Sequence, residues 1–358
     1  MQNFRIEQIT FTRFIAAMAI VIFHFGNEVI PFNIEPLRTI ILSADVGVSY
    51  FFILSGFIMI IVYFKRGNIQ PIEYYQSRFA RIYPVYFLAI ILCQLAILLK
   101  LLSFDFSGLI LNIFMVQAWI PGKALTVNSP AWSLSVEVLF YSLFPFLLLV
   151  YKKISLGLSL TIGLFLFLIS QVITNWLVSS TFYQGYPSPS HDAIFYYPLM
   201  HLNEFITGNI TGLFFIRYFE GRFRKNGALI FLVGIIMLVV LYMSLGLEKH
   251  NGLLAIVFVP LIILISTDNG ILSVLFSQPL FIFLGEISYG IYILQVPIFF
   301  LSKKLLALLG VTGPIRIFYF YVLILITAAS LIYIFIEKPL RKWINGFQLL
   351  SPNSSQTH

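Results

Sequence analysis

Long apolar stretches alternate with short polar ones along the whole chain. The apolar stretches lie at about 10–30, 39–64, 82–101, 131–151, 154–178, 196–219, 227–245, 252–267, 280–302 and 315–337. Most are close to the roughly 20 residues that an α-helix needs to cross the hydrocarbon core of a bilayer. The pattern predicts an all-α, polytopic integral membrane helical bundle with about ten transmembrane helices. Residues 1–345 would form this membrane domain, and residues 346–358 a short disordered tail.

Two local patterns refine this prediction. The segment 104–120 is shorter and amphipathic, which favours an interfacial or re-entrant piece over a further crossing. Lys152 and Lys153 separate the stretches 131–151 and 154–178, so these two helices should be antiparallel neighbours.

Lysines and arginines are spread unevenly over the loops. With the N-terminus in the cytoplasm, most of the 22 Lys and Arg residues would lie on the inner side. Cytoplasmic loops of membrane proteins carry an excess of these residues. We therefore expect both termini to be cytoplasmic.

The composition agrees with a membrane protein and excludes a soluble globular domain, because 59% of the residues are hydrophobic and only 10% are charged. The net charge of +8 gives no indication of nucleic-acid binding, since most of the chain would lie in lipid. Cys93 is the single cysteine, so an intramolecular disulfide is impossible. The sequence also contains no cluster with metal-ligand spacing, and no metal is expected.

Arg13 and His24 lie inside the first apolar stretch. On an α-helix, a separation of eleven residues places both side chains on one face, about 16 Å apart along the axis. A charge near the bilayer centre costs on the order of 3 kcal/mol or more, so such residues usually line a polar cavity. The alternative is a histidine that hydrogen-bonds to a neighbouring helix and has no further role.

Several acidic residues would lie at a depth comparable to that of His24. Glu137 and Asp45 follow helix starts on the outer side, and His201 and Glu204 share one helix face at i,i+3 spacing. A carboxylate beside a histidine orients the ring and makes it a better general base. Glu137 is our preferred partner of His24, although each carboxylate is equally suited to a structural hydrogen bond.

Arg78 and Arg81 lie three residues apart, just before the third long apolar stretch. Two guanidinium groups on one helix face can clamp a phosphate, although such a pair can also anchor the helix at lipid headgroups. Together with Arg13 and His24, the pair suggests a phosphate-bearing donor with a long flexible arm. Coenzyme A has this shape.

Polar residues inside two other apolar stretches are candidates for substrate contacts. Ser135 lies in the stretch 131–151, and Tyr289 and Gln295 lie in the stretch 280–302. These segments are too polar for lipid-facing helices, so they either line a substrate groove with Asp45 or hydrogen-bond between helices.

Six short strings in this order resemble acyltransferase family 3, a family of integral membrane acyltransferases that modify exopolysaccharide, O-antigen and related glycans. The strings are Arg13 with His24 at R-x10-H spacing, FFILSGF at 51–57, Arg78 and Arg81 followed by Ile82 and Pro84, WSLSVE at 132–137, ISYGIY at 287–292, and IEKPLR at 336–341. The resemblance covers nearly the whole chain. One departure is Gln295, which replaces a histidine found in many relatives and so argues against a second proton relay.

The resemblance implies a transferase of the bacterial cytoplasmic (inner) membrane that uses acetyl-CoA, or another acyl-CoA, from the cytoplasm. The acceptor would be a sugar hydroxyl of an extracytoplasmic or lipid-linked glycan. His24 would be the catalytic residue, Arg13, Arg78 and Arg81 would serve the donor site, and polysaccharide assembly proteins would be partners.

The leading hypothesis from these residues is therefore O-acetylation of a glycan. His24 would act as the base, with Glu137 holding its ring, or would carry the acyl group itself. The rival hypothesis is a proton-coupled transporter or flippase, in which the same charges relay protons or bind a polar solute. A scaffold subunit of a polysaccharide assembly complex is a third reading, but it leaves the charges within the apolar stretches without a role.

Overall fold

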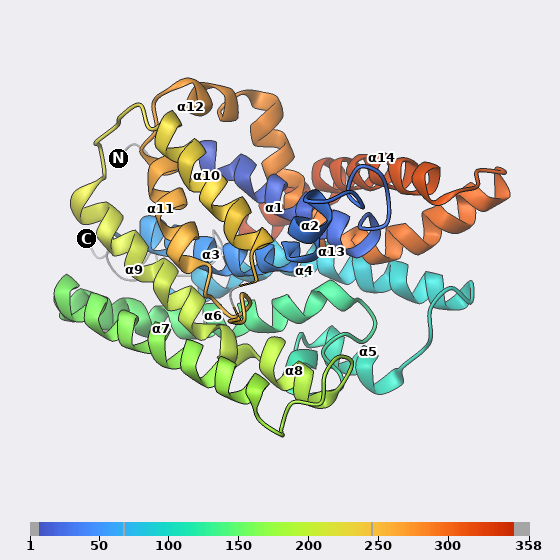
Figure 1. The fold of residues 1–358 in the computed structure, drawn as a ribbon, viewed down its shortest axis with the longest axis horizontal. Coiled ribbons are helices and arrows are strands. Elements are labelled where there is room, and N and C mark those ends of the chain that lie inside the picture. Colours follow the sequence, from blue (N-terminus) through green and yellow to red (C-terminus); the bar gives the residue numbers. More distant parts are fainter. Residues whose placement is uncertain (1–6, 67–68, 245, 347–358) are drawn as a thin grey trace, which may run out of the picture.

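The computed structural model describes residues 7–66, 69–244 and 246–346, and these form a bundle of helices without a strand (Figure 1). The tail predicted for residues 346–358 lies outside the described residues, except for Gly346. The helices are α1 (Gln8–Phe25), α2 (Leu37–Leu42), α3 (Gly47–Tyr63), α4 (Pro71–Leu98), α5 (Phe106–Ile113), α6 (Trp132–Lys153), α7 (Leu156–Ser179), α8 (Pro189–Phe195), α9 (Leu202–Tyr218), α10 (Gly227–Tyr242), α11 (Ala255–Ser266), α12 (Ile271–Phe276), α13 (Pro279–Leu308), α14 (Pro314–Ile332) and α15 (Lys338–Gly346).

The predicted all-α membrane fold is confirmed. Seven helical segments within the described ranges are long and apolar enough to cross a bilayer, and α10 and α11 are shorter apolar helices. Each apolar stretch of the sequence overlaps one of these helices or α9. The exact number of crossings and the cytoplasmic position of the termini stay predictions.

One helix boundary differs from the sequence expectation. The stretch 82–101 was expected to begin after the two arginines, but α4 begins at Pro71. Proline is favoured at the first position of a helix, where the missing N–H is not needed. As a result, Arg78 and Arg81 lie within a long helix, in agreement with their expected position on one helix face.

The segment 104–120 is short, as its amphipathic pattern predicts. It contains α5 and a 3-10 turn at Gln117–Trp119, both too short to span a bilayer. The Asp105 carboxylate caps α5 by accepting a hydrogen bond from the Gly108 N–H at 2.9 Å, and the Lys123 ammonium lies 2.8 Å from it. The Gly108 bond, together with Lys123 and Ser107, lowers the pKa of Asp105 to about 2.

The core of the bundle is the contact between α3 and α9, and α7 packs on the outer side of α9 (Figure 1). Gly56 of α3 faces the backbone of Phe205 and Gly208 in α9, so the two helices approach at backbone distance. On the other side, α1 packs against α13, which in turn contacts α14 and α4.

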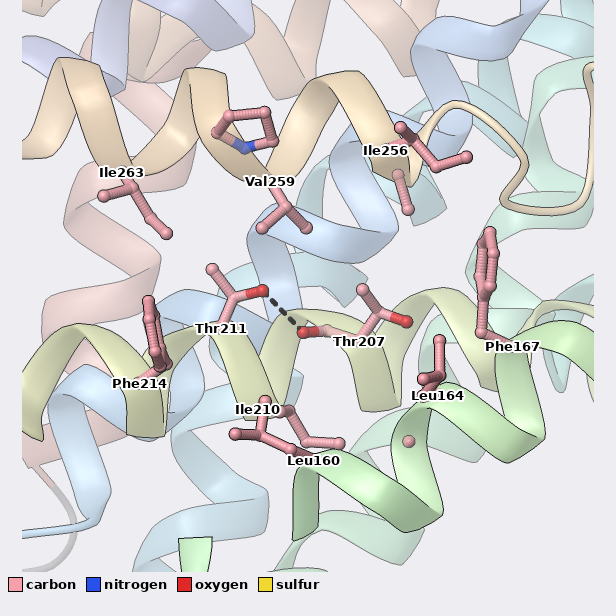
Figure 2. Close-up of a pocket in the computed structure, with 13 residues that line it drawn as sticks. Leu160, Leu164, Phe167, Thr207, Ile210, Thr211, Phe214, Ile256, Val259 and Ile263 are labelled. Carbon is pink, nitrogen blue, oxygen red and sulfur yellow. Dashed lines mark hydrogen bonds between the residues drawn. The ribbon is translucent and has the colours of Figure 1, made fainter. Parts of the chain in front are cut away.

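An apolar groove of about 370 Å³ lies between α7, α9 and α11 (Figure 2). Its lining includes Leu164, Ile210 and Val259, and no charged residue takes part. The Thr211 hydroxyl donates a hydrogen bond to the Thr207 carbonyl within α9 at 2.7 Å. The groove therefore offers a hydrocarbon surface and no group suited to catalysis.

Candidate active site

A second cavity, of about 640 Å³, lies at the end of the bundle where α1 ends and α6 begins. It combines polar, aromatic and charged side chains from helix ends and from the loops between them. Its lining includes His24, Asp45, Trp132, Tyr183, Tyr186, His191, Tyr196, Glu248, Lys249, His250 and Tyr292. A pocket with apolar walls and a few convergent polar groups is the usual form of a ligand site.

His24 is held in this cavity by a glutamine. Its Nδ1 atom lies 2.8 Å from Oε1 of Gln295, while Nε2 of Gln295 donates a hydrogen bond to the Tyr292 carbonyl at 2.7 Å. Because the amide nitrogen already donates to that carbonyl, Oε1 must accept a hydrogen bond from Nδ1–H of His24. In the neutral ring this leaves Nε2 of His24 with a free lone pair.

This arrangement corrects the expectation that Glu137 orients His24. Glu137 accepts a hydrogen bond from the Tyr141 hydroxyl at 3.1 Å and interacts electrostatically with Arg13. It follows Trp132, which lines the cavity, by five residues, so it lies about 7.5 Å further along α6 and on a different face. Glu137 therefore lies between the two regions, because it interacts electrostatically with Tyr292, which lines the cavity, and with Arg13 and Arg81.

Asp45 is the acidic residue that the structure brings close to His24. It lies in the 3-10 turn Ala44–Val46, lines the cavity and interacts electrostatically with the His24 ring. Its Oδ1 atom accepts a hydrogen bond from the Val46 N–H at 3.0 Å, which fixes the carboxylate at the start of α3.

Ser135 and Tyr289 do not line this cavity. Ser135 is fully buried, and its hydroxyl accepts a hydrogen bond from the Ala118 N–H at 3.4 Å. The Tyr289 hydroxyl donates to the Ile82 carbonyl at 2.7 Å and so connects α13 to α4. Both have the alternative role given above, which is hydrogen bonding between segments.

His201 and Glu204, which were expected on one helix face, are in contact. Nδ1 of His201 lies 2.7 Å from the Glu204 carboxylate, and Nε2 donates to the Phe195 carbonyl at 3.0 Å. The pair is fully buried, with the His201 ring 5.1 Å from that of Trp132. It supports the cavity wall from behind and does not line the cavity.

Several cavity residues were missed because they lie in the polar connections between apolar stretches. Tyr183, Tyr186 and His191 come from the segment between α7 and α9. Burial lowers the pKa of His191 to about 4, with His250 adding to the effect, so His191 is neutral near pH 7. The aromatic residues and the histidine in that connection were the sequence signal that could have identified it as part of the cavity.

Arg13, Arg78 and Arg81 gather near the opposite end of the bundle. Arg13 and Arg81 interact electrostatically with each other and with Glu137 and Glu337. The guanidinium of Arg78 lies 5.8 Å and 5.7 Å from the ring centres of Tyr63 and Tyr141. These distances are within the range of cation–π contacts.

Ion pairing in this cluster is weak. Arg81 lies 3.6 Å from the Glu337 carboxylate. Within the described part of the chain, no carboxylate lies within salt-bridge distance of Arg13 or Arg78, and Nε of Arg78 has no hydrogen-bond partner. Positive charges in a low-dielectric environment are costly unless an anion compensates them. The cluster is therefore suited to an anionic ligand.

Glu337 and Arg341 belong to this region and were not singled out as site residues in the sequence. Both lie in the string IEKPLR at 336–341, Glu337 in a π-helical turn (Tyr333–Glu337) that joins α14 to α15. Their i,i+4 spacing was the signal that could have identified them.

Comparisons with known proteins agree with one family. A family model described as an acyltransferase domain matches residues 6–335. The chain is 28% identical to acyltransferase MdmB of Streptomyces mycarofaciens over 42% of this chain and 41% of that protein. It is 36% identical to the exopolysaccharide production protein ExoZ of Rhizobium meliloti (strain 1021), over 27% of this chain and 32% of that protein.

A longer alignment, with 24% identity, covers 87% of this chain and 55% of O-acetyltransferase OatA of Staphylococcus aureus (strain MRSA252). The matched regions thus span less than two thirds of each of these relatives. No solved structure matches the chain significantly. Because the family model covers nearly the whole chain, this protein belongs to acyltransferase family 3.

Proposed function

We propose that this protein is a membrane O-acyltransferase that transfers an acetyl or other acyl group from cytoplasmic acyl-CoA to a sugar hydroxyl of an extracytoplasmic or lipid-linked glycan. Family membership and the names of ExoZ and OatA support acyl transfer to a polysaccharide. The observation that carries the proposal is the cavity around His24, where Nε2 is left free by the bond between Nδ1 and Gln295.

The donor would bind at the arginine cluster. Arg13 and His24 lie on one helix about 16 Å apart along its axis, so a long arm must connect an anion bound near Arg13 to the His24 ring. Acyl-CoA has phosphates at one end and a thioester at the other. Its phosphates would pair with Arg13, Arg78 and Arg81, and its thioester would reach the cavity.

The acceptor would enter the cavity from the opposite end. Trp132, Tyr186 and Tyr196 offer aromatic faces, and Asp45 and Lys249 offer polar contacts. Aromatic faces combined with a few polar groups suit a sugar ring, which has an apolar face and a rim of hydroxyls. Asp45 would contact the sugar or the His24 ring.

Two routes of transfer are compatible with this geometry. In the first, Nε2 of His24 removes the hydroxyl proton while the sugar oxygen attacks the thioester carbonyl. The carbon–sulfur bond then breaks, and the leaving thiolate takes up a proton. In the second, Nε2 attacks the thioester carbonyl, the carbon–sulfur bond breaks, and the thiolate leaves. The sugar oxygen then attacks the acyl carbon, the carbon–nitrogen bond breaks, and the hydroxyl proton passes by way of the freed Nε2 to the thiolate. In both routes Gln295 keeps the proton on Nδ1.

The test is acyl transfer by the purified protein in lipid nanodiscs, with labelled acetyl-CoA and an acceptor glycan. His24→Ala should lower the transfer rate by at least about 100-fold, because general-base or nucleophilic catalysis is lost. Arg78→Gln should raise KM for acetyl-CoA, because a phosphate contact is removed. Gln278→Leu, a change at the N-cap residue just before α13, should leave both values unchanged.

The outcomes separate the alternatives. Label trapped on His24 in the absence of acceptor would select the acyl-carrier route. Normal transfer by His24→Ala would overturn the assignment of the base. Movement of a solute or lipid-linked saccharide without consumption of acetyl-CoA would favour the transporter hypothesis instead.

A further inference from the structure

Helix α15 lies directly against the arginine-bearing part of α4. The Gln76 side chain donates a hydrogen bond to the Ile344 carbonyl, and Arg81 is paired with Glu337 at 3.6 Å. These two contacts hold both ends of α15 against the same helix. Residues of α15 that face α4 therefore belong to the surroundings of Arg78 and Arg81.

Arg341 is such a residue. It follows Glu337 by four positions, so both side chains lie on one face of the helix. The Arg341 guanidinium interacts electrostatically with Arg81, Glu337 and Arg78. The guanidinium groups of Arg13, Arg78, Arg81 and Arg341 thus lie among three carboxylates, those of Glu137, Glu286 and Glu337. Positive charge is in excess, and a phosphate-bearing ligand would neutralise this excess.

The cations differ in their access to water. Arg13, Arg78 and Arg81 are half-buried, whereas Arg341 is exposed. Glu337, between Arg81 and Arg341, is buried, and its Oε1 atom has no hydrogen-bond partner. The positive charges therefore extend from the interior of the bundle to its surface.

Coenzyme A has its functional groups in a matching order. Its thioester is followed by the pantetheine arm, the diphosphate and finally the 3′-phosphate of the ribose. We propose that Arg341 binds the ribose 3′-phosphate while Arg78 and Arg81 hold the diphosphate, so that α15 forms part of the donor site. This inference rests on the proposed function, since it requires a coenzyme A donor.

The experiment compares acetyl-CoA with acetyl-dephospho-CoA, which lacks the 3′-phosphate, as donors for the full-length protein in nanodiscs. The wild type should show a lower KM for acetyl-CoA. Arg341→Gln should raise KM for acetyl-CoA about tenfold and leave KM for acetyl-dephospho-CoA unchanged, because a charge-assisted contact to one phosphate is lost. Arg341→Lys should retain part of the discrimination, since lysine keeps the charge without the planar fork.

Lys342→Gln is the matched control, because it removes a positive charge from the adjacent position, about 100° around the same helix. It should leave KM for both donors unchanged. This comparison separates a direct contact from a general loss of positive charge on α15.

Three results would overturn the inference. Equal KM values for the two donors in the wild type would mean that the 3′-phosphate is not recognised, and this result does not depend on the folding of any variant. An equal rise in both KM values in Arg341→Gln would place Arg341 elsewhere on the donor. No change in KM for either donor in Arg341→Gln would exclude Arg341 from the donor site. The proposed function would be judged separately, because it is supported by loss of transfer in His24→Ala.

Discussion

At the scale of single residues, the least expected feature is the amide beside His24. A carboxylate was expected there, but the neutral Gln295 accepts a hydrogen bond from Nδ1–H while its own amide nitrogen donates to the Tyr292 carbonyl. The Tyr321 hydroxyl donates to the Gln295 carbonyl at 3.1 Å, so the backbone of this residue is fixed as well. The orientation of the His24 ring therefore depends on a group that carries no charge.

Replacing this amide should affect turnover more than donor binding. Gln295→Met is similar in size but removes the acceptor for Nδ1–H, so the ring can rotate or adopt the other tautomer. We expect kcat for acyl transfer to fall by about 10- to 100-fold. This loss does not exceed the factor that a general base usually contributes to the rate. KM for acetyl-CoA should stay unchanged.

Gln295→Glu keeps an acceptor oxygen and should retain more activity than Gln295→Met. Steady-state kinetics of the two variants in nanodiscs gives the comparison. Equal losses in both variants, or a rise in donor KM alone, would contradict the assigned role of the amide.

The candidate residues were predictable to different degrees. Arg13, His24, Arg78 and Arg81 stand out because ionisable side chains are rare within or at the edge of apolar stretches. The contact of His24 with Gln295 joins residues 271 positions apart, and such a contact depends on how the helices pack. The sequence pattern contains no information on that packing.

At the scale of helices, the close contact of α3 and α9 depends on glycines. A Cβ atom at Gly208 would meet the backbone of Ile53 and Phe57, and one at Gly56 would meet the backbone of α9. Because backbone atoms cannot move aside as a flexible side chain can, added methyl groups would force the helices apart.

Gly208→Ala should therefore lower the free energy of unfolding by about 1–3 kcal/mol, the usual cost of overpacking a core. Gly234→Ala is the matched control, because Gly234 lies within α10 and a Cβ atom there would meet no atom of the described residues within 4 Å. That change should be neutral or stabilising by up to about 1 kcal/mol. Thermal unfolding of both purified variants in detergent measures the difference, and equal stability of the two would contradict the backbone contact.

The positions of the long helices follow from the lengths of the apolar stretches, because a bilayer requires a minimum length. Two details do not follow from hydropathy. The first turns of α4 contain Gln76, Arg78 and Arg81 and resemble a polar loop in sequence, yet they are helical. The π-helical turn at Tyr333–Glu337 interrupts an otherwise uniform helical pattern and directs Glu337 toward Arg81.

At the scale of the whole molecule, the two polar sites lie toward opposite ends of one bundle. The cavity around His24 lies where α1 ends and α6 begins, whereas Arg78, Arg81 and α15 lie near the start of α4. The positive-inside rule then predicts that the cavity opens outside the cell and that α15 faces the cytoplasm.

Cysteine labelling in cells tests this orientation. The native Cys93 is fully buried, so it should contribute little background. A thiol introduced by Tyr186→Cys, at a residue that is 64% exposed on the cavity, should react with a membrane-impermeant maleimide in intact cells. Lys342→Cys, on α15, should react only after the cells are permeabilised. The reverse pattern would place both termini outside.

The separation of the two sites has a pharmacological consequence. Tyr186 and His24 line the same cavity. In the orientation predicted above, a compound that mimics the acceptor would reach the imidazole from the external medium. Such an inhibitor would need neither uptake into the cell nor resistance to efflux. It would also avoid competition with the abundant nucleotides of the cytoplasm, because the donor site that we propose lies among the arginines, toward the other end of the bundle.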